Sequence, residues 1–151
     1  LGGIPLKELT VRQGAGRVEL DFSTPNPQEM VHLLVNSGAV GLQMKNLGNA
    51  GFAEMTFEGG AASYKFEFGG VLKRDARAKI STSMAPVEIR IPSTTAARVI
   101  ENTVLASLDL GDGFMKKSGA FLTEAAWAGK TPVLTIQANI SLGSLALRSV
   151  Q

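Results

Sequence analysis

The stretch that decides the fold is Leu9 to Phe22, LTVRQGAGRVELDF. Apolar residues occupy Leu9 and Val11, glycines occupy Gly14 and Gly16, and apolar residues then return at every second position up to Phe22. A period of two is typical of β-strands with one apolar face, and small residues allow a sharp corner between strands. The stretch therefore predicts a short strand, a tight corner and a longer strand.

Near copies of this template recur to the end of the chain. The third, Met55 to Phe68, fills all seven template positions with apolar or small residues, and only the fifth departs strongly, with Glu101 at an apolar position. Corners of the first five copies lie roughly 21 to 24 residues apart, and the last copy follows a longer insertion. The aligned positions of the other copies are Gly38, Val40, Leu42 and Met44; Ala78, Ile80, Ser83, Ala85, Val87, Ile89 and Ile91; Val99, Val104, Ala106, Leu108 and Leu110; and Ile136, Ala138, Ser141, Gly143, Leu145 and Leu147. Repeats of this period are typical of stacked units that each bury an apolar face against the next.

These repeats predict the fold class. We expect residues 1–151 to form a single all-β domain of six stacked strand-corner-strand units, arranged as a β-solenoid, with a sandwich arrangement left open. Glycine at the corners Gly14, Gly38 and Gly60 is expected because it accepts positive φ and lets neighbouring corners approach. The predicted core is Leu20, Phe66, Ile89, Leu108, Leu110 and Leu145.

One outward-facing template position gives a test of stacking. Asp21 in the first copy becomes Lys45, Glu67 and Arg90 in the next three, so the charges alternate in sign. If copies stack in chain order, each charge lies beside opposite charges, which stabilises cross-strand pairs. The alternative is chance alternation on a solvated face.

The insertion from residue 114 to residue 132, FMKKSGAFLTEAAWAGKTP, breaks the repeat. It contains the only tryptophan, Trp127, together with Phe114 and Phe121. Two interpretations are open. Either these aromatic residues cap the open end of the stack, or Phe121 and Trp127 form an exposed patch that binds a partner.

Composition excludes several classes of protein. Lys and Arg number 15 against 13 Asp and Glu, and a net charge of +2 is too small to favour nucleic-acid binding. The basic cluster Lys73 to Arg77, KRDAR, is interpreted as a solvated edge that discourages aggregation. Without cysteine the chain has neither disulfides nor thiolate metal sites.

No cofactor or metal site is predicted. His32 is the only histidine and lies in an apolar run, where we expect a strand residue with a hydrogen-bonded ring. The segment Asp109 to Gly113, DLGDG, lacks the further oxygen ligands of a calcium loop, so a turn is the better interpretation. Phosphate-loop and dinucleotide motifs are absent.

Catalytic residues are not predicted either. The chain has no G-x-S-x-G motif, and the remaining option is glycoside hydrolysis by paired carboxylates, with Asp21, Glu67 and Glu88 as candidates on predicted strands. Lysine and arginine alternate with these carboxylates and favour their ionised form, whereas a general acid must hold a proton. We therefore expect a protein that is not an enzyme, with a carbohydrate-active enzyme or glycan-binding domain as the alternative.

The run from Arg77 to Leu110, which contains VEIRIPSTTAARV, the following GF at Gly113, and the terminal GSLALR resemble the bacterial toast-rack family. This family is related to LiaF-like cell-wall-antibiotic-response proteins and, more distantly, to adhesin-type domains built from similar repeats. GAGRVELDF and GGAASYKFEF resemble its earlier part, while Met84-Ala85-Pro86 departs from the corner glycines of such proteins.

The resemblance implies an all-β, toast-rack-like stack and a non-catalytic role at the bacterial cell envelope, with the extracytoplasmic side favoured. It implies protein interaction, envelope-stress sensing or adhesion, an envelope protein or a glycan as partner, and tethering to a membrane by a segment outside this chain. A purely structural spacer is the third hypothesis. The resemblance carries over no catalytic residue, cofactor or oligomeric state.

Overall fold

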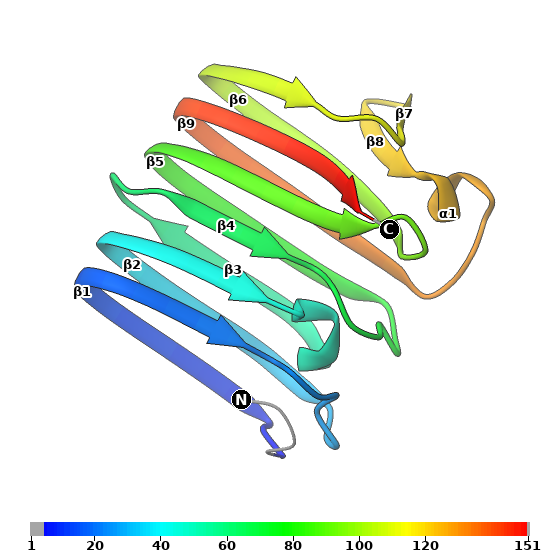
Figure 1. The fold of residues 1–151 in the computed structure, drawn as a ribbon, viewed down its shortest axis with the longest axis horizontal. Coiled ribbons are helices and arrows are strands. Elements are labelled where there is room, and N and C mark those ends of the chain that lie inside the picture. The colour runs from blue at the N-terminus through cyan, green and yellow to red at the C-terminus, as the bar shows by residue number, and fades with distance from the viewer. Residues whose placement is uncertain (1–4, 151) are drawn as a thin grey trace.

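The computed structural model describes residues 5–150, apart from the side chains of residues 39 and 40. The protein is all-β, as predicted, and its strands are stacked along one axis (Figure 1). The strands are β1 (Glu8–Asp21), β2 (Met30–Lys45), β3 (Phe52–Gly59), β4 (Tyr64–Glu67), β5 (Ala76–Pro92), β6 (Ala96–Leu110), β7 (Phe114–Lys117), β8 (Ala120–Thr123) and β9 (Val133–Val150). Two short helices, η1 (Leu47–Ala50) and α1 (Glu124–Trp127), lie between strands.

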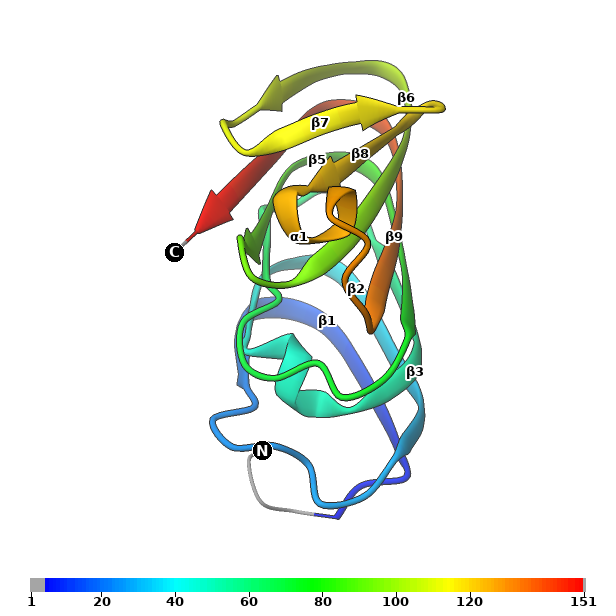
Figure 2. The same ribbon diagram turned by 90° about the vertical axis from the view of Figure 1, so that its right-hand side faces the viewer.

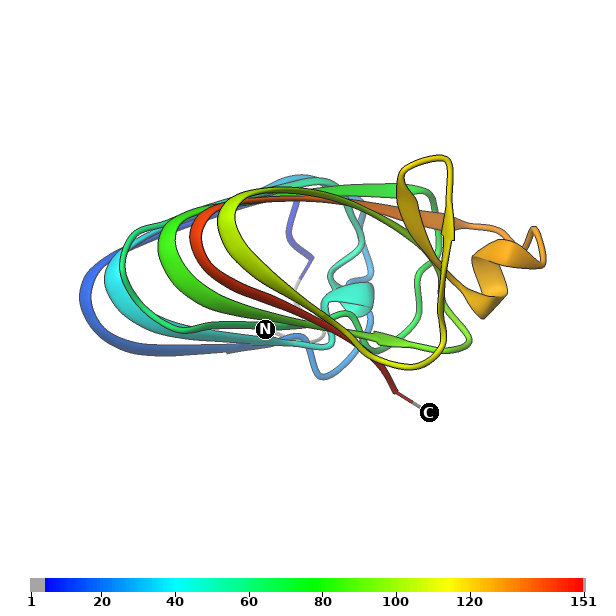
Figure 3. The same ribbon diagram turned by 90° about the horizontal axis from the view of Figure 1, so that it is seen from above.

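The long strands β1, β2, β5, β6 and β9 each bend in the middle, and Figure 3 shows them as nested U shapes. The third repeat follows the same path but is interrupted at its corner, so it appears as β3 and β4. Neighbouring repeats pair in parallel, in the order β1, β2, β3 with β4, β5, β9 and β6. We call the layer of arms before the corner the first wall and the layer after it the second wall. The apolar core lies between the walls.

The register of the pairing reproduces the alignment of the copies. Leu20 lies beside Met44, Met44 beside Phe66, and Phe66 beside Ile89. Residues at equal positions of neighbouring repeats therefore form rows across the stack, apolar on the inner side of each wall and polar on the outer side.

The order of the repeats differs from the order in the chain. The last copy, β9, lies between β5 and β6 and pairs with both. β9 supplies fully buried residues such as Ile136 and Leu147, whereas β6 carries Glu101 at an apolar position. An interior repeat must be apolar on its inner face, and an end repeat can turn a carboxylate toward water.

The predicted charge alternation is only partly correct. Asp21 does lie beside Lys45, and Glu67 lies beside Arg90 with 3.7 Å between a guanidinium nitrogen and a carboxylate oxygen. Lys45 instead forms its ion pair with Glu19, at 3.0 Å. Beyond Arg90 the pattern ends, because β9 places Arg148 beside it.

The corner glycines act differently from the prediction. Positive φ occurs at Gly16 (111°) and Gly143 (120°), and not at Gly14, Gly38 or Gly60. A Cβ atom on Gly38 would lie 2.9 Å from the carbonyl oxygen of Gly14, and one on Gly60 would lie 2.8 Å from that of Gly38. Gly38 and Gly60 therefore permit close stacking of corners, while Gly16 and Gly143 permit the bend itself.

The core contains Phe66, Ile89 and Leu145 as predicted, each fully buried. Leu20 is half-buried, and the prediction is wrong for Leu108 and Leu110, which are 37% and 40% exposed. Both lie on the end repeat, where no strand of the described residues covers their far side.

Candidate functional site

The candidate carboxylates lie on the outer face of the second wall and are engaged in ion pairs. Arg90 lies 3.7 Å from Glu67 and 2.9 Å from Glu88, and Lys65 lies 3.6 Å from Glu67. Asp21 accepts a hydrogen bond of 2.8 Å from Asn46. Glu67 and Glu88 thus both contact the same arginine on this face.

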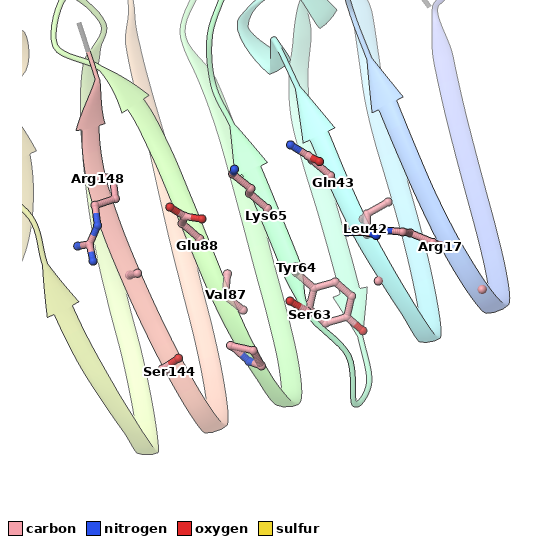
Figure 4. A pocket seen from close by; sticks show the side chains of 14 residues that line it. Arg17, Leu42, Gln43, Ser63, Tyr64, Lys65, Val87, Glu88, Ser144 and Arg148 are labelled. Atoms are coloured by element: carbon pink, nitrogen blue, oxygen red, sulfur yellow. The ribbon is translucent and has the colours of Figure 1, made fainter.

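A groove of about 590 Å³ crosses this same face, perpendicular to the strands (Figure 4). Small residues including Gly41, Ser63 and Ser144 form its floor, and Arg17 and Arg148 line it from different strands. Arg148 donates a hydrogen bond to Asp109, and this contact holds the pKa of the Asp109 carboxyl below its usual value. Among the charged residues that line it, Lys65, Glu88 and Arg148 each form an ion pair within the chain.

His32 lies half-buried on β2, and its Nε2 atom is 3.3 Å from the hydroxyl oxygen of Thr56. The prediction of a strand histidine with a hydrogen-bonded ring is confirmed. Within residues 5–150, side chains of histidine, aspartate and glutamate form no group of three that would hold a metal ion.

The insertion lies at the β6 end of the stack (Figure 2). β7 and β8 form an antiparallel pair, and β8 also pairs with the first arm of β6 at Arg98 and Val99. Thr123 accepts a hydrogen bond from the Ala97 amide and donates one to the Thr95 carbonyl. The insertion thus covers the edge of β6 in the first wall.

The two predicted partner-binding residues are in different environments. Phe121 is buried at 6% exposure in the core cluster, whereas Trp127 is 53% exposed on α1. Phe121 is therefore not accessible to a partner, because it lies beside Val99 of β6 with its side chain in the core, and the two residues do not form one exposed patch. Partner binding by Trp127 stays a prediction.

We expect acrylamide to quench the fluorescence of Trp127 efficiently in the folded protein. The indole is half exposed, with the Lys117 ammonium 5.4 Å from its ring centroid. As a control, Lys117→Gln should leave the quenching constant high, because the lysine lies over the ring without burying it. A quenching constant that rises strongly on unfolding would contradict this exposed position.

The second arm of β6 presents an uncovered apolar edge. One side of this arm pairs with β9, and no other strand within residues 5–150 pairs with its far side. Leu108 and Leu110 lie beside Leu145 and Leu147, which are fully buried, but are themselves more than a third exposed. Val104 and Leu105, near the corner, are 77% and 74% exposed. Backbone donors and acceptors on this edge are free to pair with an added strand.

The opposite end of the stack is protected differently. β1 carries the exposed charged residues Arg12, Arg17 and Glu19, and Leu9 and Leu20 on its inner side are half-buried. Charged side chains discourage pairing at a sheet edge. The contrast makes the second arm of β6 the less protected edge of the protein.

A third surface was missed by sequence reasoning. Arg77, Lys79 and Arg98 line a cleft of about 480 Å³ on the outer face of the first wall. Arg77 belongs to the cluster interpreted as a solvated edge, and Arg98 lies one repeat later. The available signal was that Arg77 and Arg98 occupy the same template position, one residue before Ala78 and Val99.

The fold places this chain in the class of all-β proteins with parallel strands around a flattened apolar interior. No family model matches the chain, and no curated protein is similar to it in sequence. It is similar in structure to the crystal structure of a "putative cell adhesion protein" from Clostridium sporogenes, with a TM-score of 0.82. The two are 8% identical, and the similarity covers 98% of this chain and 94% of the other.

None of the helices in the described part of the chain has the length and apolar character needed to cross a membrane.

Proposed function

We propose that this chain is a non-catalytic interaction module of the bacterial cell envelope, acting in adhesion or envelope-stress sensing through contact with a protein. The observation that carries the proposal is the uncovered apolar edge of β6. The similar fold of the adhesion protein from Clostridium sporogenes and the resemblance to the toast-rack family support the proposal. A stacked solenoid of the toast-rack type, exposed on the extracytoplasmic side and tethered by a segment outside this chain, fits this role.

The proposed occupant of the edge is an extended segment of a partner protein, added as a further strand. Main-chain hydrogen bonds to β6 supply affinity in this mode of recognition, and alternate side chains supply specificity. Leu108 and Leu110 project on the inner side of the wall, so a partner segment with apolar residues at alternate positions would continue the core.

We expect the double variant Leu105→Lys/Leu108→Lys to abolish most of the adhesion. The chain is displayed on a non-adherent bacterial host, and adherent cells are counted on a layer of bacterial cells. Buried lysine ammonium groups oppose strand addition, so adherence should fall to about a tenth, a loss of roughly 1.4 kcal/mol in binding free energy. Protease treatment of the layer should remove adherence by the unmodified chain as well.

Val31→Lys is the matched control, since Val31 is 57% exposed and lies away from β6, near the start of β2. It should adhere normally. Equal adherence by the double variant and the unmodified chain would contradict the proposal, as would adherence that survives protease treatment.

The carboxylates on the second wall leave one alternative function open, that of a carbohydrate-active enzyme. The ion pairs of Arg90 with both Glu67 and Glu88 are evidence against this alternative. Release of reducing ends from a polysaccharide, lost in Glu67→Gln or Glu88→Gln, would overturn the non-catalytic proposal.

A further inference from the structure

We propose that the cleft on the outer face of the first wall binds a carboxylate-bearing glycan, a sugar polymer of the uronic-acid type. The inference goes beyond the proposed contact with a protein, because it assigns a second class of ligand, a glycan, to the same interaction module. It uses a surface separate from the edge of β6.

Pairing of three strands brings the cations together. Thr135 on β9 lies beside Arg77 of β5 on one side and beside Arg98 of β6 on the other. Neighbouring strands are about 4.8 Å apart, so the two arginine backbones lie about 10 Å apart with the shorter threonine between them. Lys79 follows Arg77 on the same face, beside Gln137. An anionic group seated over Thr135 is thus within reach of two guanidinium groups.

The cations of this cleft form no ion pair with any carboxylate of the described residues. No carboxylate of residues 5–150 lies within 4.0 Å of Arg77, Lys79 or Arg98. On the second wall, by contrast, Lys45, Lys65, Arg90 and Arg148 each have a carboxylate partner. The nearby Asp75 carboxylate accepts a hydrogen bond from the Val133 amide. The three cations remain available to an external anion.

The rest of the lining favours an acidic sugar among anionic ligands. Arginine matches the planar, two-oxygen geometry of a carboxylate. Gln137 and Thr135 offer acceptors as well as donors, and the exposed Glu54 carboxylate beside Arg77 accepts only. Hydroxyl groups of a sugar can donate to these acceptors, whereas an ionised polyphosphate offers them no hydroxyl donor. No aromatic side chain lines the cleft for stacking nucleic-acid bases.

The test is titration calorimetry with an oligogalacturonate probe at low salt. We expect saturable binding, weakened about tenfold in Arg77→Gln and about tenfold in Arg98→Gln, the scale of one charge-assisted hydrogen bond. Arg12→Gln is the matched control: Arg12 is an exposed arginine on β1 that forms no ion pair with any of residues 5–150, and its removal should leave the affinity unchanged. Circular dichroism confirms folding of each variant.

The outcomes separate the alternatives. Absence of binding, equal loss in Arg12→Gln, or tighter binding of polyphosphate or sulfated dextran would overturn the proposed carboxylate ligand. The double edge variant Leu105→Lys/Leu108→Lys should bind the probe normally. Intact probe binding by a chain that never supports adherence would therefore support the cleft and overturn only the proposed function.

Discussion

Gly143→Ala is expected to lower the free energy of unfolding by about 2–5 kcal/mol, the sum of backbone strain and steric overlap. Gly143 has a φ of 120°, which residues with side chains rarely adopt. A Cβ atom there would lie 2.2 Å from the carbonyl oxygen of Ala85, its neighbour in the ladder between β5 and β9. Both strands are interior to the stack, so neither is free to move away. Urea unfolding followed by circular dichroism measures the effect.

Other corner glycines separate the two causes. Gly16 has a φ of 111° but open space around a Cβ, so Gly16→Ala should show only the cost of strain, about 1–3 kcal/mol. Gly38 has the close contact with Gly14 but no positive φ, so Gly38→Ala should show only the overlap. Gly14→Ala has neither and should change stability by less than about 0.5 kcal/mol. If Gly143→Ala were as stable as Gly14→Ala, this would contradict the close approach of the β5 and β9 backbones at this corner.

The sequence was sufficient to predict the faces of the strands. Alternation at Met55, Phe57, Tyr64 and Phe66 shows which residues face inward, and the repeat shows which positions of different copies are equivalent. The observed register agrees with that alignment, because slipping a strand by one residue would turn its apolar side chains to water.

The order of the strands in the sheet could not be predicted from the local sequence pattern. Every copy carries the same apolar positions, so each could pair with any other, and alternation does not distinguish between neighbours. Glu101 was the residue that marked β6 as an end repeat, because a carboxylate at a core position needs access to water. The chain-order prediction placed each charge of this row beside opposite charges, whereas β9 places Arg148 beside Arg90.

The candidate surfaces depend on that same order. The second arm of β6 has one unpaired edge, because β9, which follows β6 in the chain, pairs with the edge that faces the other long strands. Arg77 and Arg98 flank Thr135 because β9 separates β5 from β6. Both surfaces arise because β9 takes its place between β5 and β6. Neither surface follows from the spacing of residues along the chain.

Phe57→Ala is expected to lower the free energy of unfolding by about 3–5 kcal/mol, as for other buried phenylalanines. Phe57 is fully buried on β3 of the first wall. Its ring makes edge contacts with Tyr64 and Phe66 of β4 in the second wall, with centroids 4.8 and 4.9 Å away. The ring also packs tightly against Gly59, where a Cβ would lie 2.8 Å from it. Removing it leaves a cavity between the walls.

Phe114→Ala is the matched control, because Phe114 is half-buried on β7 at the end of the stack. Phe114→Ala should lower the free energy of unfolding by about 1 kcal/mol, roughly half the transfer free energy of a buried side chain. In a stack each repeat contacts only its neighbours, so Phe57→Ala should accelerate amide hydrogen exchange most in β3 and β4, next in β2 and β5, and least in β6. Uniform acceleration of hydrogen exchange along the whole stack would show that the stack unfolds as a single cooperative unit. An equal loss of unfolding free energy in Phe57→Ala and Phe114→Ala would show that the aromatic cluster does not hold the two walls together.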